Sequence, residues 1–391
     1  PSDDFEVLRI SFVFRGGSAV QQVPFSASAA ANLLAEGSRD MTGAEIAERL
    51  DYYGSWYDVN LDRDYAYINF ATLSKFFDRT LAVAEQILLY PTFPEEELRS
   101  YCAKRRQRLA IERTKVDVEA REAFAKALFG AGHPYGISSD EAEYDRLTRD
   151  AVVAFHTAHY TAENCFVVCS GRIGAHERQA IAALAERIPQ RAAAAPAVFP
   201  EPQTTRSVFV EHPGAVQSSL RIGRVLFPRQ HPDFVGMQVV ATALGGYFGS
   251  RLMQNLREEH GYTYGAVAAM VNFERTGYFA VATQVGTDVT REALREIFRE
   301  IERLGAEPLS EEELGLVRNM MIGEMMRVLD GPFGIADVTI ENILCGTDNS
   351  IISENIRRIR RITPEEVRQL ARRYLRREEL VTVVAGAEKP W

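Results

Sequence analysis

Apolar and polar residues alternate in several short stretches of the chain, a pattern that predicts β-strands with one buried face. The first half contains four such stretches, of which the middle two flank Asp62-Arg63-Asp64 and are expected to form a hairpin: Val7–Phe14, Trp56–Leu61, Tyr65–Leu73 and Cys165–Ser170. Apolar residues recur with helical spacing in other segments, which predicts helices over Phe25–Glu36, Phe77–Leu89, Glu95 to about Phe129, Asp150–Tyr160 and about Ala175–Ile188.

Helix ends are marked by local chemistry. Thr42 followed three residues later by Glu45 is a capping box, in which each side chain satisfies a free backbone N–H group of the first turn. Ile46, Leu50 and Tyr53 then define the buried face of a helix, which is expected to end at Gly54. The sequence therefore predicts a mixture of helices and hairpins in the first half.

The segment Leu244–Gly265 combines a glycine-rich entry with an amphipathic helix. Phe248, Leu252 and Leu256 are spaced by four residues and are expected to form a buried stripe.

Gly261 supplies the left-handed residue at the end of this helix, so Arg257 is expected in the last turn and Tyr264 at the start of the next strand. A guanidinium and a phenol that converge there could bind a carbonyl or a carboxylate. A surface arginine beside a half-buried strand tyrosine is the alternative.

Three segments of the first half recur in the same order in the second half. The matching pairs are Phe93–Leu98 with Leu309–Leu314, Thr148–Gly171 with Thr363–Gly386, and Gly54–Tyr57 with Gly261–Tyr264. We therefore predict an α+β chain of two homologous domains, each a mainly antiparallel sheet covered by helices. The expected boundaries are residues 1–188 and 203–391, joined by a proline-rich linker at 189–202.

Composition narrows the class of protein. The 391 residues are 46% hydrophobic and 25% charged, as in soluble globular proteins, and no apolar run is long enough to span a membrane. The net charge of −9 argues against a nucleic-acid-binding surface over the whole molecule. The chain begins at Pro1 without methionine, so its natural beginning is expected to be trimmed, and the compartment stays open between cytoplasm and periplasm.

Several local motifs resemble those of the pitrilysin/insulinase-type zinc peptidases, or inverzincins, which include the mitochondrial processing peptidase. They are Gly37-Ser38 with the helix of Glu45 and Gly54, Tyr90–Leu98, His133–Gly136, Tyr160 with Asn164, and Leu256–Tyr264. The resemblance covers essentially the whole chain. It implies two α+β domains per chain, often in two-chain assemblies that enclose a peptide chamber, and it implies that the first strand-forming segment of the usual fold is missing here.

The resemblance also implies where a zinc site would lie. The family binds zinc through an H-x-x-E-H motif on an early helix and a downstream glutamate. That motif falls on Ser28 to Asn32, so Ser28 and Asn32 replace the two histidines and Ala31 replaces the general base. The downstream ligand falls near Gln107 or Arg108, and no H-x-x-E-H occurs anywhere in the sequence. No metal or other cofactor is expected on this chain.

In two-chain family members a zinc-less subunit keeps an arginine and a tyrosine that reach substrate beside the partner's zinc. The resemblance therefore implies that Arg257 and Tyr264 bind a peptide carbonyl and stabilise negative charge. The expected partner is a zinc-bearing chain in a heterodimer, with a homodimer as the other arrangement, and the chain alone is expected to hydrolyse nothing. Two alternatives stay open: a non-enzymatic structural core protein of the same fold, and an active peptidase with an unfamiliar ligand set.

Other polar signals carry less specific interpretations. His156 and His159, with Glu163 one turn on, are interpreted as a solvated helix face rather than metal ligands, and His133 as part of a turn. The basic run 356–361 lies near several glutamates and is interpreted as a solvated helix with ion pairs. Cys165 and Cys169 would be roughly 13 Å apart in one strand, too far for a disulfide.

Overall fold

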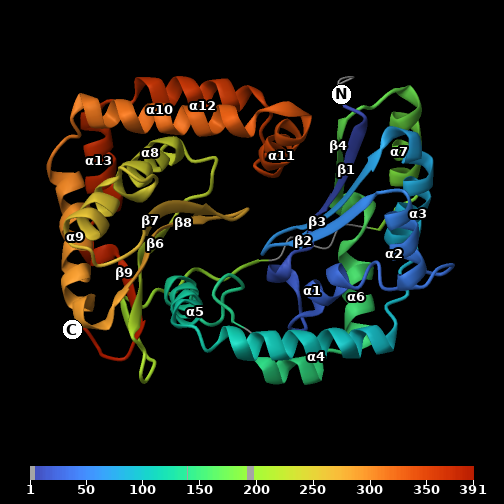
Figure 1. Ribbon diagram of the computed structural model, residues 1–391, viewed down its shortest axis with the longest axis horizontal. Helices are drawn as coiled ribbons and strands as arrows, with labels where there is room; N and C mark the ends of the chain where they lie inside the picture. The colour runs from blue at the N-terminus through green and yellow to red at the C-terminus, as the bar shows by residue number, and fades with distance from the viewer. Residues whose placement is uncertain (1–4, 139, 192–197) are drawn as a thin grey trace. The chain divides into compact units, whose positions relative to one another are not determined.

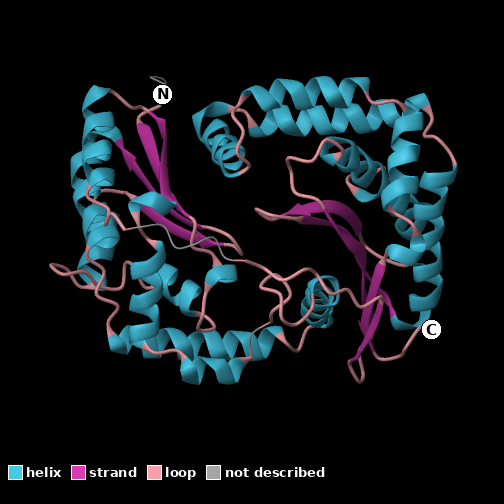
Figure 2. Ribbon diagram, turned by 180° about the vertical axis from the view of Figure 1, so that it is seen from behind, coloured by secondary structure: helices cyan, strands magenta, loops and turns pink. Residues whose placement is uncertain are grey.

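The computed structural model describes residues 5–138, 140–191 and 198–391. The chain divides into two compact units. Unit 1 comprises Pro1–Ala110, Ser139–Phe199 and Leu329–Ile340, and unit 2 comprises Ile111–Ser138, Pro200–Val328 and Glu341–Trp391. Each unit contains one sheet with helices packed against it (Figures 1 and 2).

Unit 1 is built on a four-stranded antiparallel sheet in the order β2-β3-β1-β4. Its strands are β1 (Val7–Phe14), β2 (Trp56–Leu61), β3 (Ala66–Leu73) and β4 (Cys165–Gly171). Its helices are α1 (Ser26–Asn32), α2 (Gly43–Tyr52), α3 (Phe77–Leu89), α4 (Glu95–Glu112), α6 (Arg149–His159) and α7 (Ala175–Glu186). The core side of β1 presents Leu8, Ile10, Phe12 and Phe14, all buried.

Unit 2 is built on a five-stranded sheet in the order β5-β9-β6-β8-β7. Its strands are β5 (Ser207–Glu211), β6 (Gln217–Leu226), β7 (Ala266–Asn272), β8 (Gly277–Gly286) and β9 (Val381–Gly386), and β5 pairs with β9 in parallel. Its helices include α5 (Val116–Phe129), α8 (Phe234–Gly245), α9 (Thr290–Ala306), α10 (Glu311–Val328), α12 (Ser350–Arg361) and α13 (Pro364–Tyr374).

The predicted repeat is visible in the order of the strands. Within the two sheets, β2-β3-β1-β4 corresponds to β7-β8-β6-β9, and β5 has no counterpart among the described strands of unit 1. The same caps recur, since the hydroxyl of Thr148 accepts from Ala151 N and that of Thr363 accepts from Glu366 N. The α+β class with mainly antiparallel sheets is confirmed.

The long helix predicted over Glu95 to Phe129 was wrong, because the chain breaks at Arg113-Thr114-Lys115 between α4 and α5. The Thr114 hydroxyl and its backbone N–H both donate to Ile111 O, so they close a turn instead of extending the helix. Lys115 is extended, with φ −100° and ψ 124°. The break lets α5 turn its buried residues, including Val118 and Phe124, toward the unit 2 sheet.

The compact units therefore differ from the predicted segments 1–188 and 203–391. Residues 111–138 pack with unit 2, where α5 lies against β5, β6 and β9, and residues 329–340 pack with unit 1. The latter belong to α11 (Gly331–Leu344), to which Arg9 of β1 donates through Phe333 O and the Asp337 carboxylate. Of the predicted linker 189–202, residues 192–197 lie outside the described part of the chain.

Several boundaries agree with the sequence patterns and one does not. The Thr42–Glu45 capping box is present, and Gly54 is left-handed with φ +59°. The first helix is shorter than predicted, because α1 covers only Ser26–Asn32. In the described ranges no helix has the length and apolar character needed to cross a bilayer.

Candidate functional site

Arg257 lies near the end of a π-helix in unit 2, Met253–Glu259, which directly follows the α-helical residues Arg251 and Leu252. A π-helix is rare and is found frequently at functional sites. The segment ends at Gly261, whose φ of +66° is the left-handed conformation predicted from the sequence. Leu252 and Leu256 are fully buried, so the helix is fixed on its inner side and presents Arg257 outward.

A buried polar network holds this helix against α9. The Asn255 side-chain amide donates to Glu296 Oε2 at 3.2 Å and to Glu300 Oε1 at 3.1 Å, and all three residues are buried. Arg251, one turn earlier, makes a two-point ion pair with Glu313 of α10 at 2.7 and 3.0 Å. These contacts fix the start and the middle of the helix that carries Arg257.

The Arg257 side chain is partly exposed. Its Nε lies 3.4 Å from Glu258 Oε1, and its guanidinium carbon lies 4.9 Å from the centre of the Phe248 ring. Phe248 is 63% exposed, so the predicted buried stripe holds only for Leu252 and Leu256. Phe248 lies in the turn before the helix rather than on its inner face, which is why its helical spacing was misleading.

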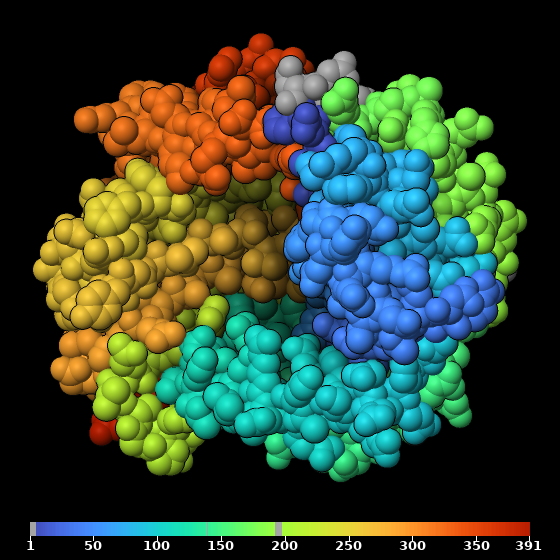
Figure 3. All heavy atoms as spheres, turned by 45° about the vertical axis from the view of Figure 1, so that its right-hand side comes forward, coloured from blue at the N-terminus to red at the C-terminus, as the bar shows by residue number. Residues whose placement is uncertain are grey.

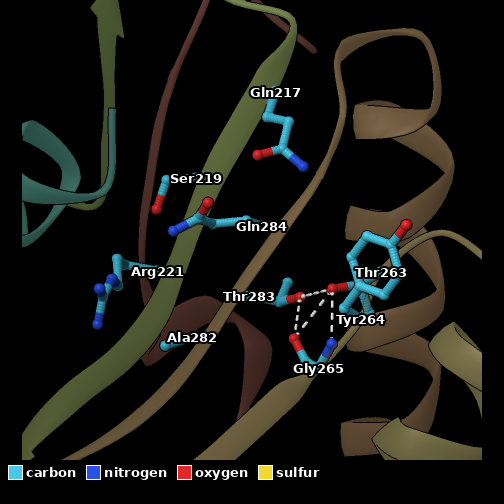
Figure 4. Close-up of a pocket in the computed structure, with 9 residues that line it drawn as sticks. All are labelled: Gln217, Ser219, Arg221, Thr263, Tyr264, Gly265, Ala282, Thr283 and Gln284. Carbon is cyan, nitrogen blue, oxygen red and sulfur yellow. Dashed lines mark hydrogen bonds between the residues drawn. The ribbon is translucent and has the colours of Figure 1, made fainter. Parts of the chain in front are cut away.

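Tyr264 lies in the loop before β7 and is 91% exposed, whereas the sequence predicted it at the start of that strand. The loop is held by Thr283 of β8, whose hydroxyl donates to Thr263 Oγ1 at 3.0 Å and to Gly265 O at 2.8 Å (Figure 4). The phenol itself is thus presented on a fixed backbone. Within the described residues, Arg257 and Tyr264 share no hydrogen bond, and each is open to solvent.

A pocket of ≈ 370 Å³ lies beside Tyr264 on one face of the unit 2 sheet (Figure 4). Its polar floor comes from alternate residues of β6, namely Gln217, Ser219 and Arg221, and from Gln284 of β8. The other face of β6 presents Leu220 and Ile222 to the core. The sequence analysis did not predict that these polar residues form a pocket, although the alternation of polar and apolar residues along β6 could have indicated it.

Ser28, Ala31 and Asn32, the predicted positions of the zinc motif, lie on α1 in unit 1, where Ser28 and Asn32 make other contacts. The Tyr101 hydroxyl of α4 donates to Ser28 Oγ at 3.1 Å, and the Asn32 side chain donates to Ser28 O at 2.7 Å. Ala31 is fully buried. Gln107 and Arg108 are exposed on α4. Three or more His, Cys, Asp or Glu side chains grouped to hold a metal were not found in the described ranges.

The interpretation of His156 as part of a solvated face was wrong. Its ring packs against Phe93 and Tyr160, with centroid distances of 5.2 and 4.8 Å, and its Nε2 is buried without a hydrogen-bond partner. Burial, with a smaller contribution from the charge of Arg191, lowers the pKa of His156 to about 4. Burial also lowers the pKa of His159. His156 thus contacts the unit 1 core through Phe93 and Tyr160, which both belong to it.

The basic run 356–361 lies on α12 and makes ion pairs, as the charge pattern indicated. Arg358 pairs with Glu366 of α13, and Arg368 pairs with Glu365. His133 lies in a turn, where Tyr135 N donates to its Nδ1 at 3.1 Å. Neither cluster assembles a catalytic group.

The sequence is similar to a known peptidase domain and to several bacterial zinc proteases. Residues 146–321 match the family model described as the Peptidase M16 inactive domain. An uncharacterized zinc protease of Streptomyces coelicolor is 23% identical over 363 residues, covering 90% of this chain and 79% of that protein. The uncharacterized zinc protease YmxG of Bacillus subtilis is 21% identical over 370 residues, covering 90% and 85%. These matches fit an inactive member of the M16, or pitrilysin-type, peptidase family.

Solved structures show the same fold. The crystal structure of a peptidase M16 inactive domain from Pseudomonas fluorescens matches with a TM-score of 0.91 and 22% identity, covering 99% of this chain and 94% of that one. A protease from Helicobacter pylori matches with a TM-score of 0.83 and 16% identity, covering 97% and 94%. The sequence contains no H-x-x-E-H motif, and the assignment of that motif to Ser28, Ala31 and Asn32 stays a prediction.

Proposed function

We propose that this chain is the zinc-less subunit of a two-chain M16-type peptidase, in which a partner carries H-x-x-E-H and zinc. The observation that carries the proposal is the contrast between two sites on one chain. The motif positions on α1 are occupied by a hydroxyl, a methyl group and an amide already bonded within unit 1. In unit 2, Tyr264 is exposed and Arg257 is partly exposed, and their backbone is held by buried contacts.

The chemistry of the two exposed groups suits a peptide. Arg257 offers several N–H donors, of which Nε faces Glu258, and Tyr264 offers a hydroxyl donor. Both can donate to a peptide carbonyl oxygen, and both stabilise the oxyanion that forms when water adds to that carbonyl. The partner's zinc would activate the water, so this chain contributes binding and charge stabilisation only.

Arg257 need not be aligned before substrate arrives. Its contact with Glu258 at 3.4 Å is long and partly exposed, so exchanging it for a substrate carbonyl costs little. Phe248, below the guanidinium, restricts its movement. The space-filling view shows the segment around residue 250 (yellow) at the surface of unit 2 (Figure 3).

The decisive experiment is native mass spectrometry of the tagged chain captured from its own cells. We expect a complex with one second polypeptide and one zinc ion, and the zinc should follow the second polypeptide when the complex is dissociated. A zinc-free homodimer would contradict the proposal and favour a structural core protein of the same fold. Zinc retained by this chain alone would contradict both.

A further inference from the structure

The polar floor of the pocket beside Tyr264 has a composition that the proposed role of Arg257 and Tyr264 does not use. Ser219 pairs with Gln284 across β6 and β8, and Arg221 pairs with Ala282, so these side chains share one sheet face. Helix α5 covers the neighbouring part of the sheet, over β5, β9 and part of β6. The pocket lies beside that cover, with Ser219 and Gln284 on its floor (Figure 4).

Ser219 is an unpaired hydroxyl inside this pocket. The residue is only 1% exposed, and its Oγ has no hydrogen-bond partner. Buried hydroxyl groups in proteins are nearly always hydrogen-bonded, so an unpaired one that lines a cavity indicates a missing partner. Its neighbour Gln284 is exposed and can supply a further N–H donor to the same space.

Arg221 is a partly buried cation without a carboxylate partner. Its Nε has no hydrogen-bond partner, and no ion pair joins it to any residue in the described ranges. Burial is the main cause that lowers the pKa of Arg221, followed by repulsion from Arg121 of α5, and Asp117 of α5 only partly opposes these effects. The positive field around this guanidinium is therefore not neutralised by the chain itself.

The first sheet provides an internal comparison. Arg9 of β1 occupies the same outer face, and its register with β4 makes it the counterpart of Ser219. Arg9 is neutralised by Asp337 of α11 and also donates to Phe333 O at 3.0 Å. The helix that covers unit 2, α5, brings Asp117 toward Arg221 without forming an ion pair among the described residues. The arginine on this sheet face is thus paired with a carboxylate in unit 1, whereas Arg221 on the corresponding face of unit 2 has no carboxylate partner in the described ranges.

We propose that this pocket is a subsite for an acidic side chain of the bound peptide, with Arg221 as the carboxylate partner and Ser219 as a second donor. An aspartate or glutamate supplies two oxygens that accept from a guanidinium fork and a hydroxyl together. A cationic side chain would meet Arg221 and is excluded by charge. The subsite deepens the proposed function, because it assumes that the peptide reaches Tyr264 at its edge.

A single-residue probe tests the pocket without requiring peptide binding elsewhere. N-acetylglutamate methylamide should protect Arg221 from modification by phenylglyoxal, measured by peptide mass spectrometry, and N-acetylglutamine methylamide should not. The expected difference in modification rate at saturating probe is about tenfold, the usual size for a charge-assisted pair. Equal rates with the two probes would contradict the subsite. Arg327, an exposed arginine in the same unit, is the control and should react at the same rate with either probe.

A randomised decapeptide library, blocked at both ends and retained by the immobilised full-length chain, tests the same pocket in peptide context. The retained peptides should be enriched about tenfold in Asp or Glu at one position. Arg221→Met should abolish the enrichment, Arg221→Lys should keep most of it, and Arg221→Glu should shift it to Lys or Arg. Arg327→Met is the matched control, and melting curves check that each variant folds.

The two assays separate the subsite from the proposed function. Enrichment that survives Arg221→Met, or retention without acidic preference, contradicts the subsite even if the complex hydrolyses peptides. Protection by the glutamate probe without retention of any peptide supports the pocket and contradicts peptide binding at Tyr264. Acidic preference in a chain that never pairs with a zinc-bearing partner supports the subsite and contradicts the two-chain peptidase.

Discussion

The Tyr101 hydroxyl donates to Ser28 Oγ at 3.1 Å, joining α4 to α1 at the position where the family's first zinc ligand would lie. Ser28 also donates to Phe25 O at 3.0 Å. The serine hydroxyl is therefore used twice in local packing. Ser28, the predicted position of the first zinc ligand, is half-buried and already bonded to two neighbouring segments of unit 1.

Zinc should not stabilise the isolated chain. A ligand present at a hundred times its Kd raises the free energy of unfolding by about 2.7 kcal/mol, which is easily seen as a rise in Tm. We expect no rise in Tm on adding zinc and no fall on adding a chelator, because Ser28, Ala31 and Asn32 supply no metal ligand set. Differential scanning fluorimetry on the chain alone measures this. A zinc-dependent Tm would show that other residues bind the metal.

Arg257→Ala should lower turnover of the two-chain complex about 10²–10³-fold, because removing one oxyanion donor has an effect of that size. Tyr264→Phe, which removes one hydroxyl and keeps the ring, should lower it about tenfold. Zinc content and assembly should be unchanged in both. Steady-state kinetics on a peptide cleaved by the wild-type complex provides the measurement.

Matched surface controls exist for both substitutions. Arg327→Ala removes an arginine that pairs with Glu324 in the same unit, and Tyr52→Phe removes the hydroxyl of another tyrosine, 80% exposed. Neither should change turnover. Full activity in both Arg257→Ala and Tyr264→Phe would remove these residues from the proposed function and leave only packing roles.

Asn255→Ala should destabilise unit 2 by about 2–4 kcal/mol, because it leaves the buried Glu296 and Glu300 without their shared donor. Urea denaturation gives the change in the free energy of unfolding. Adding Glu300→Gln should recover part of the loss, since it removes one of two like charges. Asn60→Ala removes an exposed side-chain hydrogen bond to Asp58 and should cost little. Equal costs for the two asparagine variants would contradict the buried network.

His156 should make the chain less stable in mild acid. Burial lowers the pKa of its imidazole from 6.5 to about 4, so between these pH values the unfolded chain binds a proton that the folded chain does not. The free energy of unfolding therefore falls as the pH drops through this window, by about 3 kcal/mol at the limit. Melting curves of wild type and His156→Phe from pH 7 to pH 4 should show a shallower decline in the variant.

His176 provides a control of opposite sign. A hydrogen bond from its ring to Asp78, at 2.7 Å, raises the pKa of His176. This hydrogen bond stabilises the folded chain fully below the pKa of His176 in the unfolded chain. That stabilisation is lost as the pH rises through the pKa in the folded chain, and it is small because the pair is exposed. His176→Gln should leave the acid decline intact. Identical pH profiles for wild type and His156→Phe would show that His156 is not protonated differently on folding.

Local patterns in the sequence were sufficient to predict many of the strands, helix ends and turns. The Thr42–Glu45 capping box and the alternation along Val7–Phe14 were predicted and are present, because each depends on hydrogen bonds or side-chain direction within a few residues. Gly261 was predicted to be left-handed for the same reason. The internal repeat was also visible in the sequence, and the structure shows corresponding strand orders in the two sheets.

Long-range packing decided the features that local patterns misassigned. The helical pattern continued through Arg113–Lys115, but Thr114 closes a turn there and α5 packs against β5, β6 and β9 of unit 2. His156 looked like a surface residue by spacing, and its burial depends on Phe93 and Tyr160. Phe248 looked buried, and the turn before the π-helix exposes it.

The sequence by itself determined the local motifs, the internal repeat and the lack of an H-x-x-E-H motif, because these depend only on which residues occupy which positions. Tertiary structure alone decided that Ser219 and Arg221 share a pocket with Tyr264. Their proximity depends on strand register between β6 and β8 and on where α5 stops covering the sheet. Both are set by the burial of apolar surface across segments far apart in the chain, which no short stretch of sequence encodes.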